Sequence, residues 1–93
     1  MKVAERGYTI FSKSGCPNCR KVKELIFDYG HKPIIIDCDE ALFEDRAGFL
    51  QYLADCGATG TTFPFVFLDN KYLGGYDDTK RHIEQDDAFN DVM

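Results

Sequence analysis

The stretch that decides how this chain folds is Ser12-Lys13-Ser14-Gly15-Cys16-Pro17-Asn18-Cys19-Arg20. The apolar run at residues 8–11 before it predicts a strand, and apolar residues at helical spacing over residues 22–29 after it predict a helix. Cys16 therefore falls at the first turn of a helix, where unpaired N–H groups and the helix dipole favour a thiolate. Cys19 lies one helical turn later, close enough to resolve a mixed disulfide on Cys16. The stretch is typical of a thiol redox site.

The composition narrows the classes of function. Ninety-three residues, of which 44% are hydrophobic, predict one globular domain over residues 1–93. The net charge of −5 argues against nucleic acid as the main partner. Positive charges nevertheless gather at residues 13–23. A local basic patch on an acidic protein suits a small anionic ligand or an acidic protein surface.

The four cysteines point to a reducing compartment. Residues 1–6 do not resemble a signal peptide, and no apolar run is long enough to span a membrane. We therefore expect a cytoplasmic protein without a membrane partner, in which a close cysteine pair is catalytic or binds a metal. A zinc site that recruits Cys38, Cys56, His31 or His82 stays open, although the sequence lacks the second tight cysteine pair usual in such sites. The main expectation is that Cys38 and Cys56 are small apolar residues at element ends.

The predicted elements follow the order β-α-β-α-β-β-α. This order indicates an α/β fold, with a mixed four-stranded sheet flanked by helices. The first two strands share a helical crossover and should be parallel, and the last two should form a hairpin. The predicted strands cover residues 8–12, 34–36, 63–68 and 72–73; the predicted helices run from Pro17 or Asn18 to about Tyr29, over residues 42–56, and onward from Asp77 or Asp78.

Hydrophobic patterns predict which side chains are buried. The β-branched run Ile34-Ile35-Ile36 is typical of a central strand buried on both faces. Phe63, Phe65 and Phe67 alternate along the third strand, which places them on one face of the sheet. The second helix should turn one apolar face to the core, formed by Phe43, Ala47, Leu50, Leu53 and Ala54.

Four motifs resemble those of the glutaredoxins, the smallest form of the thioredoxin fold. Cys16-Pro17-Asn18-Cys19 follows a strand, and Lys13 precedes the first cysteine by three residues. Thr62-Phe63-Pro64 matches the family's Thr-Val-Pro, whose proline is cis. Gly74-Gly75-Tyr76-Asp77-Asp78 matches a family Gly-Gly-Cys-Asp-Asp. The resemblance covers the chain from Tyr8 to about Phe89.

This resemblance implies a thioredoxin-like (glutaredoxin) fold and a glutathione-dependent thiol–disulfide oxidoreductase, with Cys16 and Cys19 as the catalytic pair. Lys13, supported by Gln51, would pair with the glycyl carboxylate of glutathione. The Phe63 backbone would bond the cysteinyl part, and the start of the last helix would receive the γ-glutamyl end. The glutathione-binding residues implied in this way are Lys13, Asn18, Gln51, Thr62, Phe63, Pro64, Gly75, Tyr76, Asp77 and Asp78.

The resemblance also implies partners. We expect a monomer that uses glutathione as reducing co-substrate, holds no resident metal, and acts on proteins carrying disulfides or glutathione, with ribonucleotide reductase among the candidates. Two alternatives remain open: a donor to ribonucleotide reductase that draws electrons from thioredoxin reductase, and a protein that holds an iron–sulfur cluster between two subunits. Asn18 replaces a common tyrosine and Tyr76 a common cysteine, which bears on affinity more than on reaction type.

Overall fold

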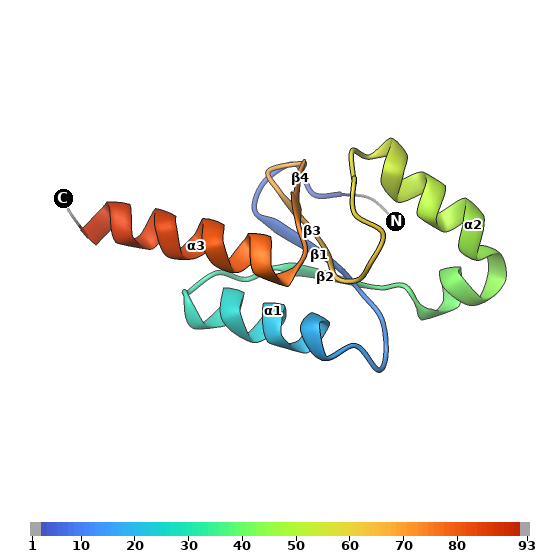
Figure 1. Cartoon of the computed structure of the whole chain (residues 1–93), viewed down its shortest axis with the longest axis horizontal. Helices are drawn as coiled ribbons and strands as arrows, with labels where there is room; N and C mark the ends of the chain where they lie inside the picture. The colour runs from blue at the N-terminus through green and yellow to red at the C-terminus, as the bar shows by residue number, and fades with distance from the viewer. Residues whose placement is uncertain (1–2, 92–93) are drawn as a thin grey trace.

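Strands and helices follow one another in the predicted order. A computed structural model describes residues 3–91, and the side chains of residues 3–85. Its elements are β1 (Tyr8–Ser12), α1 (Pro17–Asp28), β2 (Ile34–Asp37), α2 (Asp39–Asp55), β3 (Phe65–Leu68), β4 (Lys71–Gly74) and α3 (Tyr76–Asp91). The sheet has the order β2-β1-β3-β4, in which β1 is parallel to β2 and antiparallel to β3 (Figure 1). None of the helices within residues 3–91 combines the length and apolarity needed to cross a bilayer.

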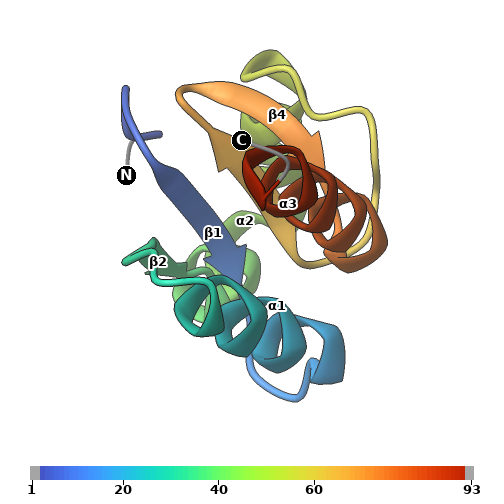
Figure 2. The same cartoon turned by 90° about the vertical axis from the view of Figure 1, so that its left-hand side faces the viewer.

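Two cores lie on opposite faces of the sheet. Successive residues of a strand point to opposite faces, so Ile10 and Phe11 of β1 enter different cores. Ile10 packs with Val22 of α1 and Ile83 of α3, and these two helices contact each other (Figure 2). Phe11 packs with Phe49 of α2. The core beneath α2 also contains the alternating phenylalanines, which confirms their predicted common face: Phe63, Phe65 and Phe67.

Strand β2 lies at an edge of the sheet, so the prediction of a central strand was wrong. Ile34 and Ile35 are 51% and 42% exposed. The interior strands are β1 and β3, and all five residues of β1 are buried. An apolar run predicts a strand but not its position in the sheet, because that position depends on which strands pair with β1. The edge is short and lies between Pro33 and Asp37, features that oppose pairing with another chain.

Helix α2 is broken at Asp45, and the break changes which side chains it buries. Asp45 has φ −157° and ψ 82°, and its carboxylate accepts a hydrogen bond from the Gly48 N–H at 3.0 Å. The second part of the helix buries Phe49 and Leu53. Phe43, before the break, is 91% exposed. The predicted apolar face is therefore right at Leu53 and partly at half-buried Leu50, and wrong at the exposed positions Phe43, Ala47 and Ala54.

The C-terminal elements frame one end of the sheet. Asp69 and Asn70 both have positive φ, 52° and 67°, and make the tight turn between β3 and β4. Helix α3 begins at Tyr76, with Asp77 and Asp78 inside its first turn, so the prediction that one of these acids caps the helix was wrong. The residue before the helix is Gly75, whose carbonyl accepts from the Thr79 N–H at 3.1 Å. The predicted position of Phe89 lies outside the described side chains.

Candidate active site

Cys16 and Cys19 meet where the chain passes from β1 to α1. Cys16 is the residue that caps α1, with extended backbone angles (φ −116°, ψ 100°), and Pro17 is the first helical residue. The Cys16 Sγ accepts a hydrogen bond from the Cys19 N–H at 3.2 Å. A disulfide joins the two cysteines, and their Cα atoms lie 5.3 Å apart. Cys19 is 1% exposed, whereas Cys16 is half-buried. The outer sulfur is thus the one that a substrate can reach.

A cavity of about 310 Å³ opens beside Cys16; we call it the cysteine cavity. Its lining brings Cys16 together with three of the predicted ligand-binding residues, Lys13, Asn18 and Phe63. The Lys13 Nζ lies 5.4 Å from the centroid of the Phe63 ring, a cation–π arrangement. Phe63 lines the same cavity, so a cation and an aromatic wall face the sulfur together.

A second cavity of about 240 Å³ continues from the first; we call it the strand cavity. It shares Asn18 and Phe63 with the cysteine cavity, and the peptide bond between Phe63 and Pro64 is cis. Its lining includes the predicted Thr62, Pro64, Gly75, Tyr76, Asp77 and Asp78. All predicted site residues except Cys19 and Gln51 therefore line at least one of the two cavities, and buried Cys19 is joined to Cys16 by the disulfide.

Gly74 makes room for the acidic end of the strand cavity. Its φ is +139°, and a Cβ atom at this position would collide with the carboxylate of Asp78. The Asp78 Oδ1 also lies 3.5 Å from the Arg81 guanidinium, one turn further along α3. The carboxylate is thus held at the rim of the cavity by the first turn of the helix.

Gln51 lies apart from the cavities in the described part of the chain. It is exposed on α2, and its amide Nε2 donates to the Asp55 carboxylate at 2.9 Å. The structure places it on the second helix, as expected, but the linings of the two cavities do not include it. Its role toward a ligand stays a prediction.

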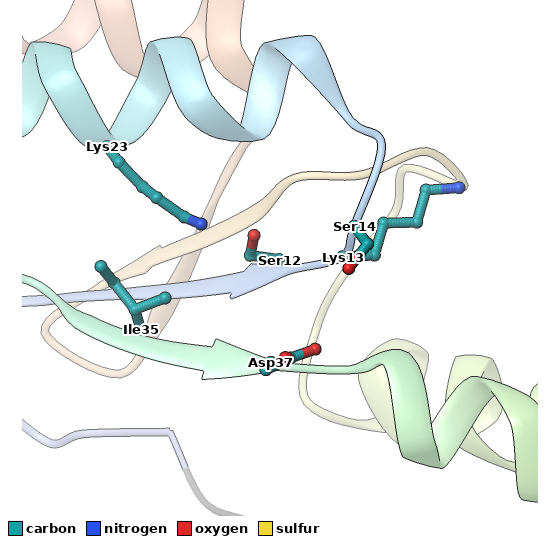
Figure 3. A pocket seen from close by; sticks show the side chains of 6 residues that line it. All are labelled: Ser12, Lys13, Ser14, Lys23, Ile35 and Asp37. Atoms are coloured by element: carbon teal, nitrogen blue, oxygen red, sulfur yellow. The ribbon is translucent and has the colours of Figure 1, made fainter.

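The basic residues between positions 13 and 23 do not form one patch. Lys13 extends toward Phe63, and Lys21 lies with its Nζ 5.9 Å from the Tyr76 ring centroid. Lys23 points from α1 toward β2, into a third cavity of about 240 Å³ that is also lined by Lys13, Ile35 and Asp37 (Figure 3). Positive charge is thus distributed around the site, with Lys13 and Lys21 beside its two aromatic walls.

Sequence reasoning missed two residues of the strand cavity, Gly60 and Tyr72. Burial raises the pKa of Tyr72, although a hydrogen bond with the Gly60 backbone opposes the shift. Tyr72 also packs edge-on against Phe67, with ring centroids 5.5 Å apart. The only sequence signal was indirect, because Tyr72 lies on β4, which pairs with β3, the strand that follows Pro64.

The remaining cysteines differ from the pair. Cys38 is fully buried, and its thiol contacts the Ile36 carbonyl oxygen at 3.5 Å. Burial raises the pKa of the Cys38 thiol to about 11. Cys56 is half-buried at the end of α2. Within the described residues, no three histidine, cysteine, aspartate or glutamate side chains gather in a metal-ligating cluster.

Comparison with known proteins gives the family. A family model described as glutaredoxin matches residues 8–73. Glutaredoxin-C4 of Arabidopsis thaliana is 35% identical over 77 residues, which cover 83% of this chain and 55% of that protein. A glutaredoxin of Ricinus communis is 35% identical over 78 residues, which cover 83% of this chain and 72% of that protein. The chain thus spans about half the length of the Arabidopsis relative.

A solved structure agrees with the sequence relatives. The buckwheat glutaredoxin–glutathione complex superposes with a TM-score of 0.64 at 30% identity, covering 84% of this chain and 69% of that one. The alignment confirms the thioredoxin-like fold that the motifs imply. The family model, the relatives and the fold agree, and the chain belongs to the glutaredoxin family.

Proposed function

We propose that the chain is a glutathione-dependent thiol–disulfide oxidoreductase, with Cys16 as nucleophile and Cys19 as resolving thiol. The observation that carries the proposal is the position of Cys16, which caps α1 and lines the cysteine cavity with Lys13 and Phe63. A reduced sulfur there meets the N–H donors of a helix start and a nearby cation, both of which favour the thiolate. The family and the glutathione-bound buckwheat relative support the co-substrate.

The proposed reaction exchanges one disulfide for another. The Cys16 thiolate attacks the glutathione sulfur of a mixed disulfide, a Cys16–glutathione disulfide forms, and the client leaves as a thiolate. A second glutathione thiolate attacks the bound glutathione sulfur, which yields oxidised glutathione and returns the Cys16 thiolate. With a protein disulfide, Cys16 forms a mixed disulfide with the client, and Cys19 attacks Cys16 and frees the client. The product is the Cys16–Cys19 disulfide seen in the structure.

We propose that glutathione lies along the strand cavity. Lys13 supplies a cation for one carboxylate, and the first turn of α3 supplies N–H donors for the other. Asp78 at the rim offers a partner for the ammonium group. The backbone beside the cis Phe63–Pro64 bond offers strand-like hydrogen bonds to an extended peptide.

Reduction of a glutathione mixed disulfide of a small thiol, coupled to glutathione reductase, tests the proposal. We expect turnover in the wild type and in Cys19→Ser, because this substrate needs only the nucleophile. Cys56→Ser is the matched control, since it removes a half-buried thiol outside both cavities. Loss of turnover in Cys19→Ser equal to that in Cys16→Ser would count against this division of roles.

The same preparation separates the alternatives. Turnover of a protein disulfide that requires thioredoxin reductase and is not supported by glutathione would replace the proposal by the thioredoxin-reductase-linked donor. Visible absorbance after anaerobic reconstitution with iron, sulfide and glutathione would favour the cluster-binding alternative. Lys13 and Asp78 support glutathione, since they are charged groups suited to its carboxylate and ammonium ends.

We propose protein clients that carry disulfides or glutathione, including ribonucleotide reductase as a candidate, and a monomer that works in a reducing cytoplasm. The free thiols Cys38 and Cys56 are compatible with such a compartment. Trapping clients on a Cys19→Ser variant, which cannot resolve mixed protein disulfides, would identify them. Recovery of proteins that carry no cysteine would reject the client class.

A further inference from the structure

The loop that carries Lys13 is tied on both sides to the junction between β2 and α2. On one side, the Ser12 carbonyl accepts from the Cys38 N–H at 2.8 Å. On the other, the Ser14 N–H donates to Asp39 Oδ1 at 2.9 Å, and the Ser14 hydroxyl donates to Asp39 Oδ2. Lys13 is thus the residue between two fixed neighbours.

Asp39 is itself well placed to hold the loop. It is the first residue of α2, and its N–H donates to Asp37 Oδ1 at 2.9 Å. The two hydrogen bonds from Ser14 lower the pKa of Asp39, so its carboxylate is charged at neutral pH. Hydrogen bonds to a charged acceptor are stronger than those between neutral groups.

The position of this loop bears on where the Lys13 ammonium lies in the cysteine cavity. The Lys13 ammonium lies over the Phe63 ring at the wall of the cysteine cavity, and Lys13 precedes Cys16 by three residues. The Lys13 side chain is long and flexible, so its reach depends on where its backbone stands. That backbone is positioned by Ser14 and, through Ser14, by Asp39.

We propose that Asp39 is a positioning residue: through its two hydrogen bonds to Ser14 it fixes the backbone of Lys13, and so places the ammonium that meets a carboxylate of glutathione. This inference rests on the proposed function for its ligand, but the tether itself does not. Asp39 lies on α2, which contributes no residue to the linings of the two cavities. Neither its sequence position nor its residue type predicted this role.

A double-variant cycle tests the chain of contacts. Asp39→Ala is expected to raise KM for the glutathione mixed disulfide by about tenfold and to change kcat by less than about twofold, since it removes hydrogen bonds to a charged group. Ser14→Ala removes the hydroxyl bond and keeps the backbone N–H bond, so it should reproduce part of this effect, and the double variant should be no worse than Asp39→Ala. In a Lys13→Met background, Asp39→Ala should add nothing. Additive losses in either cycle would overturn the proposal.

Glu40→Ala is the matched control. Glu40 lies next to Asp39 in the same first turn of α2 and is exposed, so the control removes an equal charge from the same helix start. KM should stay within about twofold of the wild type, because interactions between exposed charges are weak. An equal rise in KM for Glu40→Ala would assign the effect to net charge or helix stability and overturn the proposal.

Hydrogen exchange of the Ser14 amide separates the tether from the proposed function. Exchange should be faster in Asp39→Ala than in the wild type and unchanged in Glu40→Ala, whatever the enzyme reduces. Asp39→Asn, which keeps one acceptor oxygen, should be intermediate and guards against a variant that does not fold. Unchanged exchange in Asp39→Ala would reject the tether; faster exchange with an unchanged KM would reject the positioning role. Absence of glutathione-dependent turnover in the wild type would reject the proposed function instead.

Discussion

In two helices of this protein the capping residue before the first turn is a cysteine, and the two sulfurs have opposite surroundings. Cys16 caps α1 and Cys38 caps α2. The Cys16 Sγ accepts from the backbone N–H of its own helix and lies half-buried beside Lys13. The Cys38 thiol is fully buried, contacts a carbonyl oxygen, and has Asp37 and Asp39 as its chain neighbours.

The difference shows that a helix start does not by itself activate a thiol. At α2, the Cys38 sulfur accepts no hydrogen bond from the helix start, and the N–H of Asp39 donates to the Asp37 carboxylate instead. Burial then raises the pKa of Cys38, and repulsion from the two aspartates adds to the rise. Reactivity depends on the direction of the side chain and on the charges around it, not on its position in a motif.

Removal of each sulfur should give the largest difference between the two cysteines, measured as turnover. Cys16→Ser is expected to lower turnover of a glutathione mixed disulfide by about a thousandfold or more, because the nucleophile is lost. Cys38→Ala should keep turnover within about twofold, since this thiol lies in the core beneath α2. The coupled assay measures both, with circular dichroism as a check of folding. Similar losses in the two variants would mean that Cys38 takes part in the reaction.

The second largest difference should appear in the pH at which each thiol of the reduced protein is alkylated. Cys16 is expected to react with a midpoint well below the ~8.5 of a free thiol. Cys38 should stay unlabelled until the pH approaches about 11 or the protein unfolds. Peptide mass spectrometry assigns the label to each residue. A Cys16 midpoint near that of a free thiol would refute activation by the helix start.

Alkaline stability should contain a contribution from Cys38, beside that of Tyr72, whose pKa burial also raises. The pKa of Cys38 is raised from 9.0 to about 11 in the folded protein, so the unfolded chain loses this proton first as pH rises. Its contribution is fully present below about pH 9 and is lost as pH rises toward 11, by up to about 2 kcal/mol. Urea unfolding at about pH 7 and about pH 10.5 measures this loss. Cys38→Ala should show a smaller decrease; an identical decrease would assign the effect to other groups.

The smallest effect should come from the charges beside Cys38. Asp37→Asn removes one of the carboxylates that repel the Cys38 thiolate and keeps an oxygen that can accept from Asp39. The alkylation midpoint of Cys38 should fall, but by less than burial has raised it, because burial is the larger cause. The same peptide measurement detects the change. A midpoint that rises would contradict the proposed repulsion.

Local chemistry made the elements and the site predictable. The Cys16–Cys19 spacing, the proline that opens the third strand, and the turn at Asp69 and Asn70 each fix a backbone conformation through one or two side chains. The motifs therefore predicted the cysteine pair and the two aromatic residues of the cavities, Phe63 and Tyr76. They also gave the cis bond before Pro64, which the family resemblance implies.

Contacts between distant elements were not predictable in the same way. The run Ile34–Ile36 could not reveal that β2 stands at an edge, because that depends on β3 pairing with the other side of β1. The helical spacing through Phe43 failed because Asp45 interrupts the helix with an extended backbone. The tether from Asp39 to Ser14 spans 25 residues of sequence and follows no repeat or motif. Gln51 was assigned through the family resemblance alone, which does not specify the direction of its side chain.

The break at Asp45 also gives α2 two separate attachments. Residues before it reach the loop of the site through Asp39, and residues after it are anchored in the core by Phe49 and Leu53. Extra residues inserted between Asp45 and Arg46 would lengthen an exposed joint without altering the pairing of the strands. The joint is therefore a place where the chain can accept an insertion while both attachments of α2 are kept.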